Sequence, residues 1–156
     1  FEKFLKDKIL FFFFSQHPVQ DFKNKPKNYS RIIYIDHLKY PFYDPTSFMK
    51  SVKILFNDYS ATSTEFSLLK KPQLFYFPDY KKYNEYNGFL ENYKKNLIGF
   101  ETKDYNSLTT YITKCLQNKS FYLKKFNNQI LRYQLKYYDK LNNNSCKLFE
   151  KLIKKI

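Results

Sequence analysis

Short apolar runs separated by polar turns recur along the first half of the chain. Four of them, 9–15 (ILFFFFS), 31–36 (RIIYID), 54–56 (ILF) and 73–77 (QLFYF), are too short for buried helices and predict β-strands. Runs that are apolar on both faces are typical of central strands in parallel sheets. Helical patterns lie between and after these runs. The chain is therefore predicted to be an α/β protein with a Rossmann-like parallel sheet and flanking helices.

The central segment, 53–78, is predicted to be a strand, turn, helix and strand in succession. After the strand comes a polar turn, in which Thr62 and Glu65 match a capping box, because both side chains accept hydrogen bonds from N–H groups at a helix start. Pro72 ends this helix before the next strand begins. The apolar face of the helix is predicted to consist of Phe66, Leu68 and Leu69. The pattern predicts a βαβ unit.

Further helices are predicted on both sides of this unit. Asp44 caps a short helix at 45–51, with Pro45 in the first position. The polar, aromatic segment 79–99 is expected to be a partly helical excursion over the sheet edge. Apolar residues then recur at helical spacing in three segments, 102–118, 121–138 and 145–156. The sequence has no internal repeat and no dividing linker, so 1–156 is predicted to be a single domain.

Polar side chains follow every predicted strand. His17-Pro18 comes after the first, Asp36-His37 after the second, the turn 58–65 after the third and Pro78-Asp79 after the fourth. The carboxyl ends of parallel strands meet at one edge of the sheet, where open α/β sheets bind ligands. A single histidine is more often structural than a ligand. Two histidines and a helix start at one edge nevertheless favour a phosphate site.

The turn 58–65 offers the most ligand groups. A helix start presents free N–H groups and a partial positive charge, which suit phosphate, and hydroxyl donors are added by Ser60, Thr62, Ser63 and Thr64. The alternative is that these hydroxyls only cap the helix. The sequence contains neither G-x-x-x-x-G-K-[ST] nor G-x-G-x-x-G, and no spacing typical of metal ligands, so no metal or cofactor is predicted.

The charge of the chain narrows the class of partner. With 28 basic and 14 acidic side chains, the formal charge is +14, which favours nucleic acid, phosphorylated small molecules or an anionic membrane surface. The positive charge is nearly all Lys and is spread along the chain. Only Arg31 and Arg132 are available for bidentate contacts with bases, which argues against sequence-specific nucleic-acid binding.

Cysteine usage and the N-terminal segment indicate the compartment. Cys115 and Cys146 match no metal or redox spacing, which indicates a reduced, cytosolic protein. The apolar residues 11–14 are too few to span a bilayer. The abrupt start at Phe1 suggests a fragment of a longer protein.

A series of short motifs runs in order through the central segment. NDYSA at 57–61 is followed by Glu65, LKKP at 69–72 and a Tyr-rich stretch with GF at 88–89. This series resembles the C-terminal half of the CDP-glycerol glycerophosphotransferases, the teichoic-acid and capsule polymerases, in which T-D-Y-S-S, an acidic residue, L-K-[KR]-P and a Tyr-rich segment follow in the same order. His17-Pro18 resembles the family's basic-x-His-Pro element. The resemblance covers nearly the whole chain.

The resemblance implies a fold and a reaction. The fold is one Rossmann-like half of a GT-B-type glycosyltransferase, the half that binds the donor nucleotide. The reaction is attack by an acceptor hydroxyl on the phosphorus next to glycerol in CDP-glycerol, with CMP leaving and a cell-surface polyol phosphate or glycan as acceptor. Such an enzyme works peripherally at the anionic cytoplasmic face of the membrane. It also needs an N-terminal domain for the acceptor.

The resemblance also implies roles for individual residues. Ser60, with Thr62 and Ser63, would hold the donor pyrophosphate at the helix start. His17 would be the catalytic residue beside the phosphoryl group. Glu65 would contact the donor ribose or complete the helix cap, and Asp58 would shape the turn.

The chain departs from the family pattern at two positions, and alternatives stay open. Ala61 stands where the family has a second serine, which removes one phosphate contact, and Gln16 precedes His17 without the usual basic residue nearby.

One alternative function is that of a sugar-nucleotide glycosyltransferase of capsule or lipopolysaccharide synthesis, with the same fold. The others are a basic domain that binds nucleic acid through interleaved Lys and aromatic residues, and a non-catalytic remnant.

Overall fold

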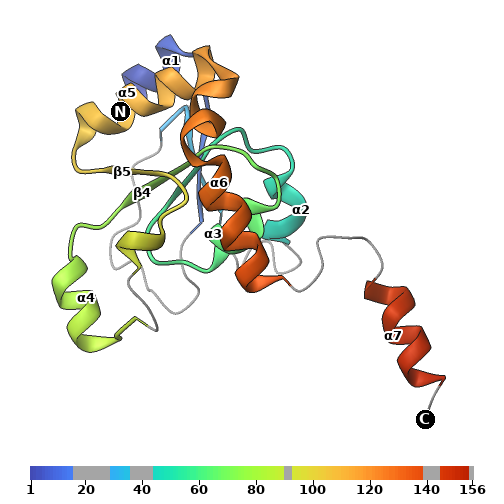
Figure 1. Cartoon of the computed structure of the whole chain (residues 1–156). Helices are drawn as coiled ribbons and strands as arrows, with labels where there is room; N and C mark the ends of the chain where they lie inside the picture. Colours follow the sequence, from blue (N-terminus) through green and yellow to red (C-terminus); the bar gives the residue numbers. More distant parts are fainter. Residues whose placement is uncertain (16–28, 36–43, 90–92, 139–144, 155–156) are drawn as a thin grey trace. The chain divides into compact units, whose positions relative to one another are not determined.

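The computed structural model describes residues 1–15, 29–35, 44–89, 93–138 and 145–154 (Figure 1). Within them the chain divides into two compact units, Phe1–Lys50 and Ser51–Ile156. Both contain parallel strands with helices around them, so the predicted α/β class with parallel strand pairing is confirmed.

The sheet of the first unit has two strands. β1 (Phe12–Ser15) runs parallel to β2 (Ile32–Ile35), with Phe12 opposite Ile32, which confirms the first two predicted strands. Burial alternates along β1, and Phe13 is 42% exposed. The prediction that this strand is buried on both faces was therefore wrong, because alternation is what a sheet with one covered face gives.

Two short helices complete the first unit. α1 (Glu2–Asp7), which the sequence did not predict, is joined to the chain before β2, because the Glu2 carboxylate accepts hydrogen bonds from the N–H (2.8 Å) and hydroxyl (2.7 Å) of Ser30. α2 (Pro45–Met49) confirms the predicted helix. Its cap is the predicted one, since the Asp44 carboxylate accepts hydrogen bonds from two N–H groups of the first turn, both at 2.9 Å.

The second unit is built on a three-stranded parallel sheet. β3 (Leu55–Asn57), β4 (Gln73–Tyr76) and β5 (Phe100–Thr102) lie in the order β3-β4-β5, and α3 (Thr62–Ser67) connects the first two (Figure 1). The predicted βαβ unit is confirmed. β5 was not predicted, because Gly99 interrupts the apolar residues Leu97, Ile98 and Phe100 and the strand has only three residues.

Gly99 lets the chain enter β5 next to β4. A Cβ atom at this position would lie 2.2 Å from the carbonyl oxygen of Gln73. Further along the strand, the buried Thr102 hydroxyl donates to the carbonyl of Phe75 at 2.9 Å. The β4–β5 pairing thus requires a residue without a Cβ atom at position 99, and it is supported by the hydrogen bond of the buried Thr102 hydroxyl.

Helices follow β4 and β5. The predicted excursion after β4 contains α4 (Tyr80–Tyr86) and a 3-10 helix, η1 (Lys94–Asn96). The three helices predicted after it are confirmed as α5 (Tyr105–Gln117), α6 (Lys119–Tyr137) and α7 (Ser145–Ile153). α6 packs against both α3 and α5. None of the helices in the described part of the chain is long and apolar enough to cross a membrane.

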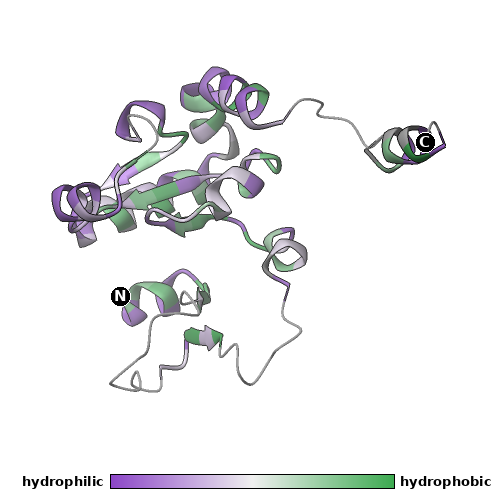
Figure 2. Ribbon diagram, turned by 90° about the horizontal axis from the view of Figure 1, so that it is seen from below, coloured by the Kyte–Doolittle hydropathy of each residue, from purple (hydrophilic) through white to green (hydrophobic). Residues whose placement is uncertain are grey.

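The core of the second unit lies between the sheet and helices α3, α5 and α6. Leu74 and Phe66 are fully buried, and apolar residues follow the strands in Figure 2. The Phe100 ring stacks on Tyr111 of α5 at 4.3 Å and meets Phe126 of α6 edge-on at 4.8 Å between ring centroids. Each such large apolar side chain contributes about 2 kcal/mol on burial. Leu68, predicted to face the core, is 46% exposed because α3 ends one residue before it.

Candidate functional site

The polar turn after β3 lies beside the turn after β4. Asn57, the last residue of β3, closes its turn, since its side-chain amide donates to the Ser60 carbonyl at 3.0 Å. The Tyr59 hydroxyl donates to the Asp79 carboxylate, which follows β4, at 2.9 Å. The predicted convergence of strand ends is therefore confirmed for β3 and β4. We call residues 58–63 the hydroxyl loop.

Two hydroxyl groups of this loop form a pair at the surface. The Ser60 and Thr62 side-chain oxygens are hydrogen-bonded at 2.9 Å, and Ser60 is exposed. The Ser60 oxygen also accepts a hydrogen bond from the Thr62 N–H at 3.3 Å. The Ser60 hydroxyl thus caps the start of α3, as the structural alternative for these hydroxyls predicts. It also lies next to the Thr62 hydroxyl, which can donate to the same ligand.

The predicted capping box of Thr62 and Glu65 is not formed. Thr62 is the first residue of α3, and the N-cap position is occupied by Ala61, which has no side-chain oxygen. The prediction was wrong by one residue, and the Ser60 hydroxyl meets the first N–H group instead. The next two N–H groups donate to the carbonyls of Ser60 (3.4 Å) and Ala61 (2.8 Å), so an anion at this helix start competes with bonds inside the loop.

Ser63 lies on the opposite side of the loop from the surface pair. It is 3% exposed, and its carbonyl accepts a hydrogen bond from the buried Gln73 side chain at 3.2 Å. The structure therefore does not bring Ser63 to the surface beside Ser60. Instead, Ser63 faces a shallow pocket of about 290 Å³, open mouth included, which is lined by Ser63, Phe75, Tyr93, Asn96, Leu97, Ile98, Tyr133 and Tyr137.

Asp58 and Glu65, the two acidic site residues predicted from the sequence, are both exposed. Asp58 takes part in the loop through its backbone, because its carbonyl accepts a hydrogen bond from the Tyr93 hydroxyl at 3.2 Å. Glu65 lies near the end of α6: burial, and then the Glu65 charge, raise the pKa of Tyr138.

The other predicted ligands lie outside the described residues. They are the candidate catalytic residue His17, its neighbour Pro18, and Asp36 and His37. Their convergence with the hydroxyl loop stays a prediction.

Tyrosines beside the hydroxyl loop were missed by sequence reasoning. Tyr93 contacts Asp58 at the start of the loop, and Tyr133 contacts Thr64 just beyond its end, although these partners lie 35 and 69 residues away in the sequence. Burial raises the pKa of Tyr93, and the nearby Tyr133 and Asp58 add to the effect. Tyr93 therefore keeps its proton at neutral pH and can donate. The only sequence signal for the Tyr93 contact was that Tyr93 belongs to a Tyr-rich segment. The sequence carried no signal for the Tyr133 contact.

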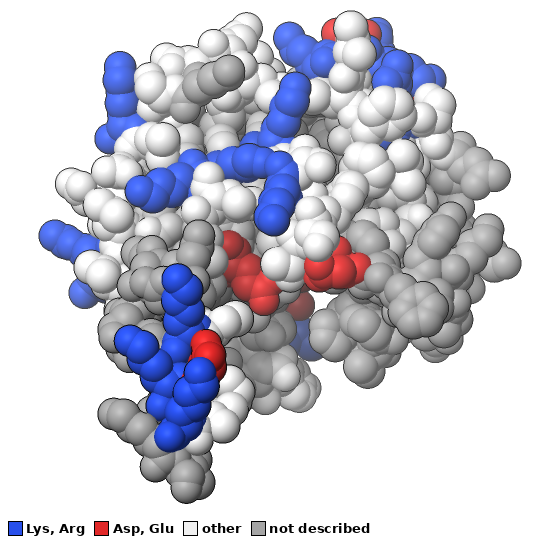
Figure 3. Space-filling view, turned by 90° about the vertical axis from the view of Figure 1, so that its right-hand side faces the viewer, with Lys and Arg blue, Asp and Glu red and all other residues white. Residues whose placement is uncertain are grey.

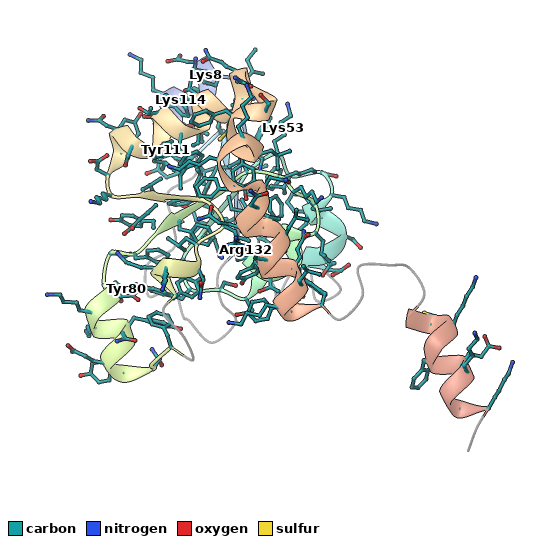
Figure 4. All side chains as sticks on the ribbon, viewed as in Figure 1. Lys8, Lys53, Tyr80, Tyr111, Lys114 and Arg132 are labelled. Atoms are coloured by element: carbon teal, nitrogen blue, oxygen red, sulfur yellow. The ribbon has the colours of Figure 1, made fainter. Side chains whose placement is uncertain are left out.

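Basic side chains are distributed over the surface. On the face in Figure 3, Lys and Arg form several separate groups, and acidic side chains also reach this face between them. Figure 4 shows Lys114 on α5 and Arg132 on α6, both of which are exposed. Lys94 is engaged locally: its ammonium lies 2.6 Å from the Glu101 carboxylate and 4.7 Å from the Tyr80 ring centroid. This distribution agrees with a diffuse Lys surface.

The described residues contain neither a cluster of metal ligands nor a reactive thiol pair. Among those residues, no three His, Cys, Asp or Glu side chains are close enough to hold a metal ion. Both cysteines are free, Cys146 exposed and Cys115 buried. Burial raises the pKa of the Cys115 thiol to about 11, so this thiol is protonated and unreactive at neutral pH.

Comparison with known families identifies the class of protein. Residues 1–153 match the model of the family described as CDP-Glycerol:Poly(glycerophosphate) glycerophosphotransferase. The match covers nearly the whole chain, and the chain belongs to this family. The resemblance inferred from the motifs is confirmed.

Parts of the chain are similar to two teichoic acid proteins. The chain is 39% identical over 64 residues to the teichoic acid glycerol-phosphate primase of Bacillus subtilis (strain 168), a match over 41% of this chain and 17% of the primase. It is 48% identical over 46 residues to the teichoic acid glycerol-phosphate transferase of Staphylococcus aureus (strain NCTC 8325 / PS 47), over 29% of this chain and 12% of that protein. Each match thus spans a small part of a longer relative.

Proposed function

We propose that this chain binds the donor of an enzyme that transfers glycerol phosphate, or a related polyol phosphate, from a CDP-activated donor to a cell-surface polymer or glycan. The observation that carries the proposal is the Ser60–Thr62 hydroxyl pair, 2.9 Å between oxygens, beyond the carboxyl end of β3 in a chain of the glycerophosphotransferase family. Two neighbouring hydroxyls at the edge of a parallel sheet suit the oxygens of a pyrophosphate.

In the proposed reaction, an acceptor hydroxyl attacks the phosphorus that carries glycerol. The bond from this phosphorus to the CMP oxygen breaks, CMP leaves with the bonding electrons, and the acceptor proton passes to His17. Ser60 and Thr62 donate hydrogen bonds to the pyrophosphate and so stabilise the charge that develops on the leaving group. Positioning and charge neutralisation supply most of the catalysis, as in phosphoryl transfer generally.

The remaining roles follow from their places around the loop. Glu65, exposed on the first turn of α3, contacts the donor ribose. Ser63 supports the loop from its inner side, through the carbonyl bond with Gln73. Asp58 shapes the turn through its backbone carbonyl. Ser63 thus contributes to phosphate binding by holding the loop backbone.

The proposed reaction also requires a second domain and an anionic environment. The chain supplies one half of a GT-B fold, and a second, N-terminal Rossmann-like domain holds the acceptor. A net charge of +14 attracts the anionic donor, a phosphate-containing acceptor and the anionic cytoplasmic face of the membrane, where the protein would act peripherally.

Ligand-induced thermal stabilisation of the chain tests the donor class. CDP-glycerol, CMP, UDP-sugars and single-stranded DNA are added separately to the wild type and to Ser60→Ala and Thr62→Val. A ligand at about 100 times its Kd adds about 2.7 kcal/mol to the free energy of unfolding. For a domain of this size that corresponds to a melting temperature higher by about 5–10 °C.

The expected result is stabilisation by the cytidine ligands that shrinks in both variants. Each shift is measured from the variant's own ligand-free melting temperature, because Ser60→Ala also removes a helix-start hydrogen bond. Thr110→Ala, on the exposed surface of α5, is the matched control and should respond like the wild type. Preference for UDP-sugars would indicate a glycosyltransferase, and stabilisation by DNA alone a nucleic-acid-binding domain. If no ligand stabilises the chain, the donor proposal is wrong.

A further inference from the structure

Three tyrosine hydroxyl groups make hydrogen bonds at the two ends of the hydroxyl loop. At its start, the Tyr93 hydroxyl donates to the Asp58 carbonyl (3.2 Å), and the hydroxyl of Tyr59 itself donates to Asp79 (2.9 Å). Just beyond its end, the Tyr133 hydroxyl is hydrogen-bonded to the Thr64 hydroxyl at 3.0 Å. The stretch between these contacts is residues 60–63, which carries the three predicted phosphate-binding side chains.

The three bonds come from separate parts of the second unit. Asp79 follows β4, Tyr93 lies at the start of η1 at the other end of the excursion, and Tyr133 is on α6. α6 packs directly against α3, which places Tyr133 beside the first turn of that helix. The loop is therefore held by contacts from the sheet edge, the excursion and a long helix.

Ring packing fixes the tyrosines at the start of the loop. The Tyr59 ring stacks on Tyr83 of α4, with centroids 3.8 Å apart and planes at 17°. Phe89 stacks on Tyr93, with centroids 5.2 Å apart and planes at 17°. Because the rings are held by packing, their hydroxyl groups have fixed positions, as a binding site requires of the residues that support it.

We propose that Tyr59, Tyr93 and Tyr133 are positioning residues that hold the hydroxyl loop in the conformation that binds the donor pyrophosphate. The inference rests on the proposed function and goes further, because it assigns a role in donor affinity to residues that do not touch the donor. A loop held in its binding conformation loses less conformational entropy when the ligand binds. Removal of one brace should therefore weaken donor binding even when the protein remains folded.

The test uses Tyr-to-Phe variants of the full chain, which keep the ring and remove only the hydroxyl. The variants are Tyr59→Phe, Tyr93→Phe and Tyr133→Phe, and the matched control is Tyr83→Phe. Tyr83 belongs to the same aromatic packing, but its hydroxyl makes no hydrogen bond within the described part of the chain. Two quantities are measured well below the melting temperature: the Kd for CDP-glycerol by calorimetry, and hydrogen exchange of the amides of residues 58–64 without ligand.

Each brace variant should bind CDP-glycerol about fivefold more weakly, the effect expected of one hydrogen bond. The double variant Tyr93→Phe/Tyr133→Phe should bind about 25-fold more weakly if the two bonds act independently. Loop amides should exchange faster in the brace variants, and Tyr83→Phe should change neither quantity. A merely structural role would lower the melting temperature and leave the Kd unchanged.

The outcomes separate this inference from the function on which it rests. If the wild type binds CDP-glycerol and all three brace variants bind it equally well, the positioning role is overturned and the proposed function stands. If the wild type does not bind CDP-glycerol at all, the proposed function fails, and the positioning role fails with it.

Discussion

The Tyr59 hydroxyl donates a hydrogen bond to the Asp79 carboxylate across 2.9 Å, and the two residues lie just beyond the ends of the neighbouring strands β3 and β4. Burial, and then this bond, raise the pKa of Tyr59, so the phenol is protonated and able to donate throughout the physiological range. The bond joins two loops that are 20 residues apart in the sequence. It ties together the β3 and β4 ends of the carboxyl edge of the sheet.

Replacing either Tyr59 or Asp79 should destabilise the protein, and the loss should be smaller when the other residue has already been replaced. In a double-mutant cycle of Tyr59→Phe and Asp79→Ala, we expect a coupling free energy of about 1 kcal/mol. Urea unfolding of the wild type, both single variants and the double variant measures it. Strictly additive effects would mean that the bond does not contribute to the free energy of unfolding.

Gly99 should be far less tolerant of a side chain than Gly88. Gly99→Ala places a Cβ 2.2 Å from the Gln73 carbonyl oxygen and should cost about 3 kcal/mol or more, because β4 and β5 must separate. Gly88→Ala meets no atom within 4 Å, and only the positive φ of +67° opposes it, at a cost of about 1 kcal/mol. Equal losses of stability in the two variants, measured by chemical unfolding, would contradict this account of the β4–β5 contact.

The sequence predicted the sheet and its helices well where apolar runs are bounded by polar turns. The runs on either side of α3 end at clear signals, such as Pro72, and both became strands. β5 was missed because it has only three residues and depends on pairing with β4, which is a non-local contact. The capping box was misplaced because Ala61, a residue with no capping side chain, occupies the N-cap position.

The candidate site was predictable only in its local part. Ser60 and Thr62 were identified because a polar turn before a helix has a recognisable pattern, and the structure places them side by side. Ser63 was grouped with them by sequence, but helical geometry turns it inward. The hydrogen bonds of Tyr93 to Asp58 and of Tyr133 to Thr64 arise from chain packing over 35 and 69 residues, and a local pattern does not reveal which residues pack together over such distances.

Stability should fall steeply at alkaline pH. Burial raises the pKa of Cys115 from 9.0 to about 11, and it also raises the pKa values of Tyr59, Tyr93 and Tyr122 above 10.0. The unfolded chain loses these protons first, so the folded state binds more protons and the free energy of unfolding decreases as pH rises above about 9. Below that pH these groups contribute their full stabilisation.

Urea unfolding at a series of pH values from neutral to about 11 measures this decrease. Tyr122→Phe serves as the comparison, because Tyr122 is 1% exposed and donates to the Ile98 carbonyl. The variant should be less stable at neutral pH and should lose less stability on alkalinisation. A free energy of unfolding that does not change up to about pH 11 would contradict the buried, protonated state of these groups.

Ala61→Ser should strengthen donor binding. This substitution restores the second serine of the family motif between Ser60 and Thr62, where Ala61 is exposed. The backbone at this position is already helical (φ −62°, ψ −15°), so a serine there caps the helix poorly and stability should change by less than about 0.5 kcal/mol. An added phosphate contact should lower the Kd for CDP-glycerol about fivefold. Unchanged or weaker binding would mean that the pyrophosphate does not lie at this turn.

Amide chemical-shift mapping with CDP-glycerol tests most directly whether the donor binds at the hydroxyl loop. We expect saturable shifts that are largest for residues 58–65, small for α5, and strongly reduced in Ser60→Ala. Shifts that centre on another part of the chain, or that are the same in Ser60→Ala as in the wild type, would contradict it.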